Sequence, residues 1–221
     1  MPTHLQTVLR TLPGLLKDPF DLDLGIEFLH GIVDTPAMRL AFRQMLIGSD
    51  ASERASLEAL TRTPFDYDAL SKLPETTFGG AYSRFMTTHG FDDPVRHVEA
   101  NPDYVEDLER NWMFARFARV HDLYHVLLGI DVSPQEETAI HVFSFINARD
   151  PVGAVIALGL PYLALRYRKR GWSWAGIRNS IRAAWALPNM FRFPYESVLA
   201  EPLVEVRARV GLSASGRAAA W

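Results

Sequence analysis

Two histidines, four residues apart, are the side chains of this chain best suited to chemistry. His121 and His125 belong to the segment His-Asp-Leu-Tyr-His, and helical side chains at positions i and i+4 project from one face, about 6 Å apart. Two imidazoles at this spacing can bind one metal ion. Asp122 lies about 100° around such a helix from His121, where its carboxylate can bind the same ion or orient a histidine.

A carboxylate from the next predicted helix can lie close to this pair. Ser133 and Glu136 are the N-cap and third position of a capping box around Pro134, so this helix should begin near Pro134 and carry Glu137 in its first turn. Only four residues, 130–133, separate it from the end of the preceding helix, so the two helices should be antiparallel neighbours. Glu137 could then meet the two imidazoles.

Other interpretations of these residues remain open. Two histidines at this spacing also occur as hydrogen-bonded pairs without a metal. Asp122 can be an ordinary solvated residue, and Glu137 can simply favour the positive end of its own helix. The combination of a helical His-Asp-x-x-His segment with a glutamate placed nearby favours a metal ion over these interpretations.

The composition limits which chemistry is possible. The chain has 221 residues, 48% hydrophobic and 22% charged, with 23 Lys and Arg against 26 Asp and Glu; these values are typical of a globular protein and exclude wholesale disorder. It has no cysteine, which excludes disulfides, thiolate zinc sites, iron–sulfur clusters and a cysteine nucleophile. Any metal must therefore be bound by His, Asp and Glu. The net charge of −3 argues against a nucleic-acid binder.

The hydrophobic pattern is helical almost throughout. Asn101 and Pro102 are typical of a helix start, and no further Gly or Pro follows before Gly129, which predicts a long helix over about residues 102–128. No Val/Ile/Thr alternation or Asn-Gly hairpin is present, so a sheet is not expected. We therefore predict an all-α, single-domain bundle over residues 1–221 with this long helix at its centre.

The second half of the chain carries a basic stretch that contains tryptophans. Residues 151–195 hold seven Lys and Arg and no Asp or Glu. The longest uncharged stretch, 151–165, is shorter than the about 20 residues of a membrane-spanning helix, and residues 1–10 lack the apolar core of a secretory signal. The chain is therefore predicted to be intracellular, with the basic stretch either a solvated helical face or a membrane-contacting surface.

The spacing of the metal-binding candidates resembles that of a known family. His121-Asp122-x-x-His125, eleven further residues and Glu137 resemble the H-D-x-x-H-x11-E signature of the coenzyme Q biosynthesis protein 4 family.

Three other segments support this resemblance. Residues 73–86 are similar to the family's segment around T-F-G-x-A-Y, residues 93–96 to its S-P-x-x-R stretch, and residues 201–207 to its acidic C-terminal helix. The resemblance covers roughly residues 36–212, which would be the family-like core of the domain.

The resemblance implies a function in ubiquinone synthesis. The family is helical, is associated with a divalent metal usually described as zinc, and replaces the C1 carboxylate of a polyprenylated benzoate ring by a hydroxyl, an oxidative decarboxylation. It is also credited with organising the biosynthetic complex. Carried over to this chain, the metal ligands are His121, Asp122, His125 and Glu137.

The resemblance also implies partners and a location. The partners would be the prenylated benzoquinone precursor, other ubiquinone biosynthesis proteins, a membrane surface and a second copy of this chain, with no nucleic acid. The location would be peripheral to the bacterial inner membrane on its cytoplasmic side, or the matrix face of the mitochondrial inner membrane.

The ligand types leave the identity of the metal open. Two imidazoles and two carboxylates suit zinc, iron, manganese or cobalt. Zinc has no redox chemistry and could act only as a Lewis acid, whereas direct oxygen activation needs a redox-active ion.

Two further groups of residues would suit a lipid substrate at a membrane. The first would contact the substrate, or else pack in the core: Phe78, Tyr82, Phe85, Met86 and Tyr124. The second would contact the membrane: Arg166, Arg168, Lys169, Arg170, Trp172 and Trp174.

Two alternative functions remain open. One is a non-catalytic scaffold that binds prenyl lipid and holds a structural metal, which four protein ligands without an open position would favour. The other is a zinc metallohydrolase, because His-Asp-x-x-His is one methylene shorter than the His-Glu-x-x-His motif of those enzymes. Such enzymes usually contain a sheet.

Overall fold

The computed structural model describes residues 2–19, 21–33, 35–91, 108–168, 172 and 174–217. Within these residues the chain is helical, with an isolated bridge between Thr77 and Pro202 and no strand, so the predicted all-α fold is confirmed. In chain order the helices are α1 (Pro2–Lys17), α2 (Leu22–Val33), α3 (Pro36–Gln44), α4 (Ala51–Arg62), α5 (Tyr67–Ser71), α6 (Phe78–His89), α8 (Leu108–Leu128), α9 (Pro134–Ala148), α10 (Pro151–Leu158), α11 (Leu160–Tyr167), α12 (Trp174–Ala186), η3 (Met190–Arg192), η4 (Tyr195–Ser197) and α13 (Leu203–Val210).

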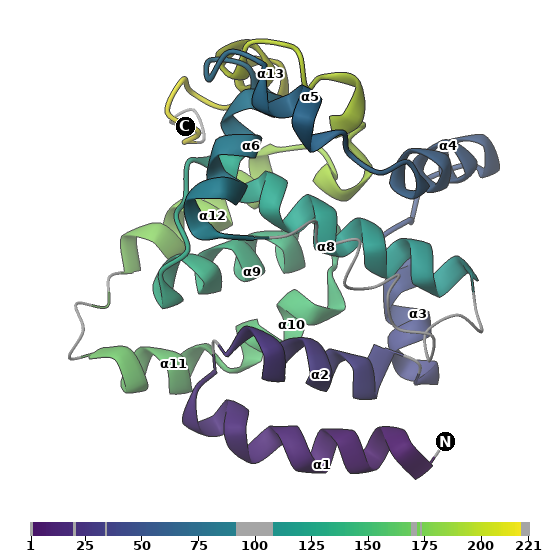
Figure 1. Ribbon diagram of the computed structural model, residues 1–221. Coiled ribbons are helices and arrows are strands. Elements are labelled where there is room, and N and C mark those ends of the chain that lie inside the picture. Colours follow the sequence, from purple (N-terminus) through teal and green to yellow (C-terminus); the bar gives the residue numbers. More distant parts are fainter. Residues whose placement is uncertain are drawn as a thin grey trace.

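Helix α8 is the long central helix and crosses the middle of the molecule (Figure 1). It packs against α3, α4, α6 and α9. Its buried side chains lie around most of the axis, which is typical of a helix enclosed by others: Trp112, Phe114, Ala115, Phe117, Arg119, Leu123, His125 and Val126. The helix ends at Leu128 as predicted. Gly129 follows with a φ of 62°, a backbone conformation that glycine adopts without strain. The predicted start, at residues 102–107, lies outside the described residues.

Helix α9 is fixed at both ends by caps. Ser133 and Glu136 form the predicted capping box at its start, and Arg149 ends it in a left-handed conformation. Asp150 then caps α10, because its carboxylate accepts hydrogen bonds from the backbone N–H groups of Val152 and Gly153 at 2.9 and 3.0 Å. The short connection between α8 and α9 makes the two helices neighbours, and α10 and α12 also pack against α9.

Helix α6 is anchored by backbone contacts to the C-terminal part of the chain. The N–H of Phe78 donates to the carbonyl of Glu201 at 2.8 Å, and the N–H of Gly79 donates to Leu199 at 2.7 Å. The helix ends at His89, and Gly90 follows in the left-handed region. These bonds fix the face of α6 that packs on α8.

The first two helices form an antiparallel pair at the edge of the molecule (Figure 1). The end of α1 is joined to α11, since the hydroxyl of Tyr162 donates to the carbonyl of Leu16 and Arg166 donates to that of Lys17. Among the described residues no helix combines the length and apolar character required to cross a membrane.

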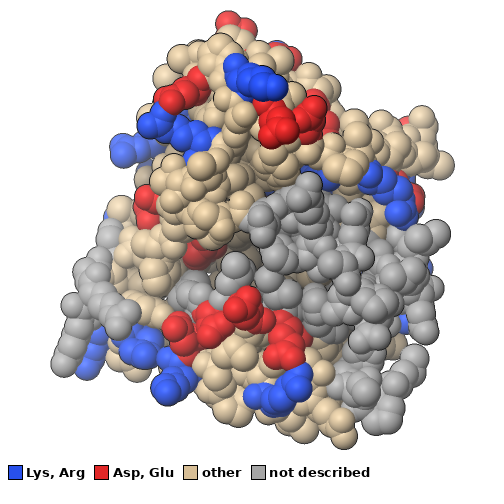
Figure 2. All heavy atoms as spheres, viewed as in Figure 1, with Lys and Arg blue, Asp and Glu red and all other residues tan. Residues whose placement is uncertain are grey.

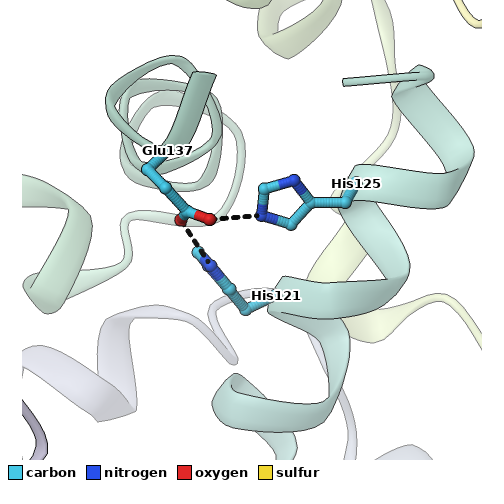
Figure 3. Close-up of side chains that lie close together, drawn as sticks. All are labelled: His121, His125 and Glu137. Carbon is cyan, nitrogen blue, oxygen red and sulfur yellow. Dashed lines mark hydrogen bonds and ion pairs between the residues drawn. The ribbon is translucent and has the colours of Figure 1, made fainter. Parts of the chain in front are cut away.

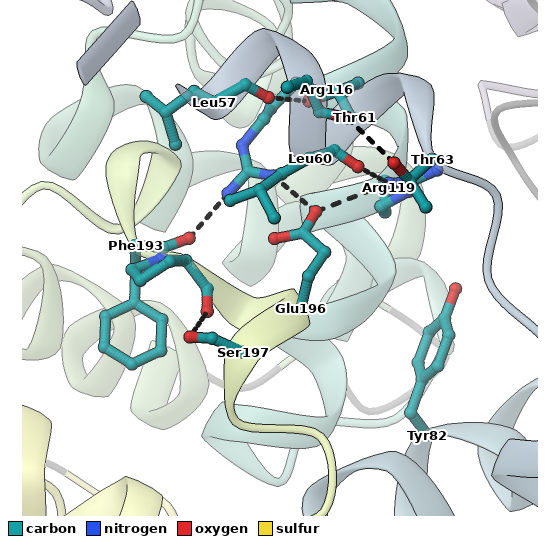
Figure 4. A network of polar contacts seen from close by, with 12 residues as sticks. Leu57, Leu60, Thr61, Thr63, Tyr82, Arg116, Arg119, Phe193, Glu196 and Ser197 are labelled. Atoms are coloured by element: carbon teal, nitrogen blue, oxygen red, sulfur yellow. Dashed lines mark hydrogen bonds and ion pairs between the residues drawn. The ribbon is translucent and has the colours of Figure 1, made fainter. Parts of the chain in front are cut away.

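A buried polar network sets the rotation of α8 about its axis (Figure 4). Arg116 is fully buried and its Nη1 lies 2.6 Å from Oε1 of Glu196, while its Nη2 donates to the carbonyl of Phe193 at 2.6 Å. Arg119, also fully buried, donates to the carbonyl of Leu60 at 3.0 Å. Arg119 lies about 200° around the helix from His121, so these bonds hold the opposite side of α8 and thereby direct the histidines toward α9.

Candidate metal centre

The predicted histidines and glutamate meet at the contact between α8 and α9 (Figure 3). Nε2 of His121 lies 3.2 Å from Oε2 of Glu137, and Nε2 of His125 lies 3.4 Å from Oε1 of the same carboxylate. One ligand atom from each of these three residues lies within 4.8 Å of the others. The chain thus brings together three residues from two helices, as the predicted antiparallel packing requires.

The spacing of these atoms fits a divalent ion. Two atoms that each bind zinc at about 2.0–2.1 Å in tetrahedral geometry lie about 3.3 Å apart. His121 and His125 lie 3.2 and 3.4 Å from different oxygens of Glu137, and one ligand atom of each of the three residues lies within 4.8 Å of the others. Nδ1 of His125 lies 3.1 Å from the carbonyl oxygen of Ile130, to which it can donate, so Nε2 is left as the metal-binding nitrogen. Two imidazoles and a carboxylate are a donor set that zinc, iron, manganese and cobalt accept.

The electrostatics of the cluster favour opposite charges on its members. Burial alone would raise the pKa of Glu137, but hydrogen bonds with His121 and His125 hold this pKa well below its usual range. Burial would likewise lower the pKa of His121, but the Glu137 carboxylate outweighs burial and raises it. A metal ion therefore competes with a proton on His121, and its binding should release protons.

Asp122 lies outside this cluster of ligand atoms. Its side chain is half-buried on α8, and its negative charge is one of the influences that raise the pKa of His121. Asp122 as a direct ligand stays a prediction.

His141 lies next to the cluster and is not part of the predicted ligand set. Its ring centre is 4.7 Å from that of His121. Burial, aided by the nearby positive charge of His121, lowers the pKa of His141 to about 3, so this side chain is neutral at physiological pH. The sequence carries a signal for it, because His141 follows Glu137 by four residues and must share its helix face.

The residues predicted to contact the substrate lie in two different environments. Phe85 is half-buried and stacks on the ring of His125 at 5.3 Å. The others are at most 2% exposed and belong to the main core: Phe78, Tyr82, Met86 and Tyr124. Tyr124 packs edge-to-face on Phe143, and burial raises its pKa above the ordinary value. Phe85 is therefore the predicted substrate residue that lies against a metal-binding candidate.

The residues predicted to contact a membrane lie around the end of α11 and the start of α12. Arg166 is near the end of α11, and Arg168 follows it. Trp172 and Trp174 contact each other edge-to-face, with ring centres 5.9 Å apart. Lys169 and Arg170 lie outside the described residues.

Curated proteins similar to this chain share one name. The mitochondrial ubiquinone biosynthesis protein COQ4 of Podospora anserina is 27% identical over 203 residues, which cover 89% of this chain and 64% of that protein. The protein of the same name from Meyerozyma guilliermondii is 28% identical over 199 residues, with coverages of 84% and 60%. This chain thus spans less than two thirds of the length of either relative.

A solved structure and a family model extend the comparison. The crystal structure of a Nostoc punctiforme protein assigned to ubiquinone biosynthesis matches with a TM-score of 0.71 over 93% of this chain and 97% of that chain. Its 21% identity makes this a likeness of fold. The model of the family described as coenzyme Q (ubiquinone) biosynthesis protein Coq4 matches residues 44–215, the greater part of this sequence, and the chain therefore belongs to the Coq4 family.

Proposed function

We propose that this chain acts in ubiquinone synthesis and replaces the C1 carboxylate of a polyprenylated benzoate by a hydroxyl, using a divalent metal ion. The observation that carries the proposal is the meeting of His121, His125 and Glu137 at metal-ligand spacing in a chain of the Coq4 family. Asp122 belongs to the proposed ligand set through the family signature.

The proposed reaction exchanges a carboxylate for a hydroxyl, and its bonds and electrons can be accounted for. The bond between the ring carbon and the carboxylate breaks and CO2 leaves, while a new carbon–oxygen bond forms. The exchange is a two-electron oxidation. It balances when water supplies the hydroxyl oxygen and an oxidant such as O2 takes up the two electrons and two protons as H2O2. A bound divalent ion would supply Lewis acidity at the ring substituent, and iron, manganese or cobalt could also exchange electrons.

The side chains around the centre suit an aromatic, prenylated substrate. His125 is 1% exposed, and Phe85 covers one face of its ring. Phe85 also packs against Phe91 with ring centres 6.1 Å apart. A ring placed beside this aromatic pair would be shielded from water on an apolar side. Its carboxylate would face a divalent ion held by Glu137 and the histidines, which would offset the negative charge of Glu137.

A peripheral contact with a membrane is part of the proposal. Helices α10 to α12 expose large apolar side chains between basic residues: Leu158 is 83% exposed, Leu165 61%, Trp174 47% and Trp185 76%. Trp at the interface and Arg at the headgroups are typical of proteins that rest on anionic lipid. The face shown in Figure 2 carries both acidic and basic side chains, so charge alone does not single out a membrane-facing surface. Helix α1 also exposes leucines, and the proposal of a contact through α10–α12 is supported by the combination of exposed tryptophans with arginines there. We place the protein at the inner membrane, with the other ubiquinone biosynthesis proteins and a second copy of this chain as its partners.

Complementation tests the enzymatic proposal. Wild-type protein should restore quinone production in a cell that lacks its own C1-processing activity, and Glu137→Gln should abolish it because one metal ligand is lost. Glu205→Gln, the same chemical change at an exposed position of α13, is the matched control and should restore production. Full complementation by Glu137→Gln would refute metal-dependent catalysis and favour the scaffold function.

Vesicle binding tests the membrane contact. Replacing Arg166 and Arg168 by Glu should weaken binding to anionic vesicles strongly, since each basic charge near such a surface contributes about 1 kcal/mol. The control makes the same charge change on α4 and α6, in Arg62→Glu with Arg84→Glu, and should leave binding in place. Equal losses in both double variants would contradict a contact through α11.

A further inference from the structure

A third histidine lies beside the candidate metal centre without belonging to the family signature. We propose that His141 is a further ligand of the metal ion in this chain, so that a third imidazole joins the proposed ligand set of His121, Asp122, His125 and Glu137. The inference rests on the proposed metal site and concerns which residues complete it.

The positions of the residues on α8 and α9 are the first support. His141 follows Glu137 by four residues on α9, just as His125 follows His121 by four residues on α8. Each helix therefore presents a pair of metal-binding side chains from one face. Metal sites inside helix bundles are built in this way, from paired residues on helices that face each other.

The distances between the rings are the second support. Two imidazoles that bind one ion through bonds of about 2.0–2.1 Å have ring centres about 5 Å apart. The ring centres of His121 and His125 are 5.1 Å apart, and those of His121 and His141 are 4.7 Å apart. His141 is thus as close to His121 as a histidine that shares its ion should be.

An unsatisfied nitrogen is the third support. Nδ1 of His141 is buried and has no hydrogen-bond partner among the described residues. A buried polar atom without a partner lowers stability, so such atoms are rare unless a ligand or an ion satisfies them. The nitrogens of His141 lie outside the set of atoms within 4.8 Å of one another, so its ring must turn about its side-chain bonds to reach the ion.

The backbone of His141 packs closely against α10. A Cβ atom on Gly153 of α10 would lie only 2.4 Å from the carbonyl oxygen of His141, so α10 packs directly against this part of α9. Since α10 confines the backbone from this side, we expect the His141 ring to reach the ion by rotation of the side chain.

Proton NMR of the Co²⁺-loaded protein tests the inference. Each histidine that binds Co²⁺ through one nitrogen gives a separate, strongly shifted signal from the N–H of its other nitrogen. We expect three such signals in wild type and two in His141→Gln. The Co²⁺ affinity of His141→Gln should fall by about 100-fold or more, the upper limit of what loss of a residue that only orients a ligand costs.

His89→Gln is the matched control, because His89 pairs with Asp131 at 3.1 Å and lies outside the ligand cluster. It should keep three signals and wild-type affinity. Two signals in the wild-type protein would overturn the inference while leaving the proposed metal site intact, and this count does not depend on whether His141→Gln folds. Absence of Co²⁺ binding by wild type would overturn both.

Discussion

Oε2 of Glu137 lies 3.2 Å from Nε2 of His121, across the contact between α8 and α9. Without metal a hydrogen bond joins this pair, and the carboxylate raises the pKa of the imidazole and so favours its charged form. An ion placed between the two groups replaces that bond with two stronger ones and joins the same helices. The centre should therefore stabilise the fold when loaded.

Metal should raise the stability of wild-type protein and leave Glu137→Gln unchanged. At a free metal concentration 100 times the dissociation constant, binding stabilises the folded state by about 2.7 kcal/mol. For a chain of this size that is a rise of about 5–10 °C in Tm. Thermal unfolding with and without chelator measures this rise. An equal rise in Glu137→Gln would show that the metal binds elsewhere.

Loss of the buried carboxylate of Glu196 should destabilise the protein strongly. The side chains of Arg116 and Glu196 are 0% and 10% exposed, and Arg119 lies 3.4 Å from the same oxygen of Glu196. Glu196→Gln leaves two buried guanidinium groups without a counter-charge, and breaking a buried pair costs about 3–5 kcal/mol. Urea unfolding should show this loss. The control, Glu201→Gln, removes an exposed ion pair with Arg209 and should lower the free energy of unfolding far less, because water screens that pair. Similar losses of unfolding free energy in the two variants would contradict a stabilising role for the buried Glu196 carboxylate.

Short-range sequence signals predict the helices that position the metal-binding candidates. The capping box at Ser133, the stop at Gly129 and the short connection between them place Glu137 beside His121 and His125. Each of these signals acts within a few residues, so the sequence alone is enough to recognise it. The pairing of the two helices then follows from the length of the connection.

Contacts between distant residues could not be predicted in this way. Arg116 and Glu196 are 80 residues apart, and arginine is a residue type that is almost never fully buried without a partner. Phe78, Tyr82 and Phe85 follow one another at steps of four and three residues, which is typical of one helical face, but this spacing does not tell what the face packs against. The structure places Phe78 and Tyr82 in the core and Phe85 against His125.

Gly80→Ala should destabilise the protein, because α6 passes too close to the preceding turn for a side chain. A Cβ atom at Gly80 would lie 2.2 Å from the carbonyl oxygen of Pro74, which is backbone and cannot rotate away. Such overpacking costs about 2–3 kcal/mol. Gly25→Ala in α2 is the control: a Cβ there meets nothing within 4 Å, and the change should stabilise by about 0.5–1 kcal/mol. Opposite shifts of the urea midpoint are expected, and a shift of the same sign would contradict this packing.

Asp150 should make the stability of the protein fall as pH rises. Burial raises its pKa, although the Ser144 hydroxyl donates to it at 2.6 Å and two backbone N–H groups also donate. The folded state therefore holds the proton on Asp150 up to a higher pH than the unfolded state does. The contribution of Asp150 to the free energy of unfolding is fully present below its unfolded pKa and is lost as pH rises through its folded pKa. The loss has a slope of about 1.4 kcal/mol per pH unit at most.

Two variants isolate this dependence. Asp150→Asn cannot titrate, so its free energy of unfolding minus that of wild type should increase from about pH 4 upward and become constant above the folded pKa. Ser144→Ala removes a hydrogen bond that favours the charged carboxylate, so the pKa of Asp150 should rise further and the loss of stability should extend to higher pH. Urea unfolding at a series of pH values measures both. A difference between Asp150→Asn and wild type that does not change with pH would mean that Asp150 has the same pKa in the folded and unfolded chain, and that the hydrogen bonds at the start of α10 fully offset its burial.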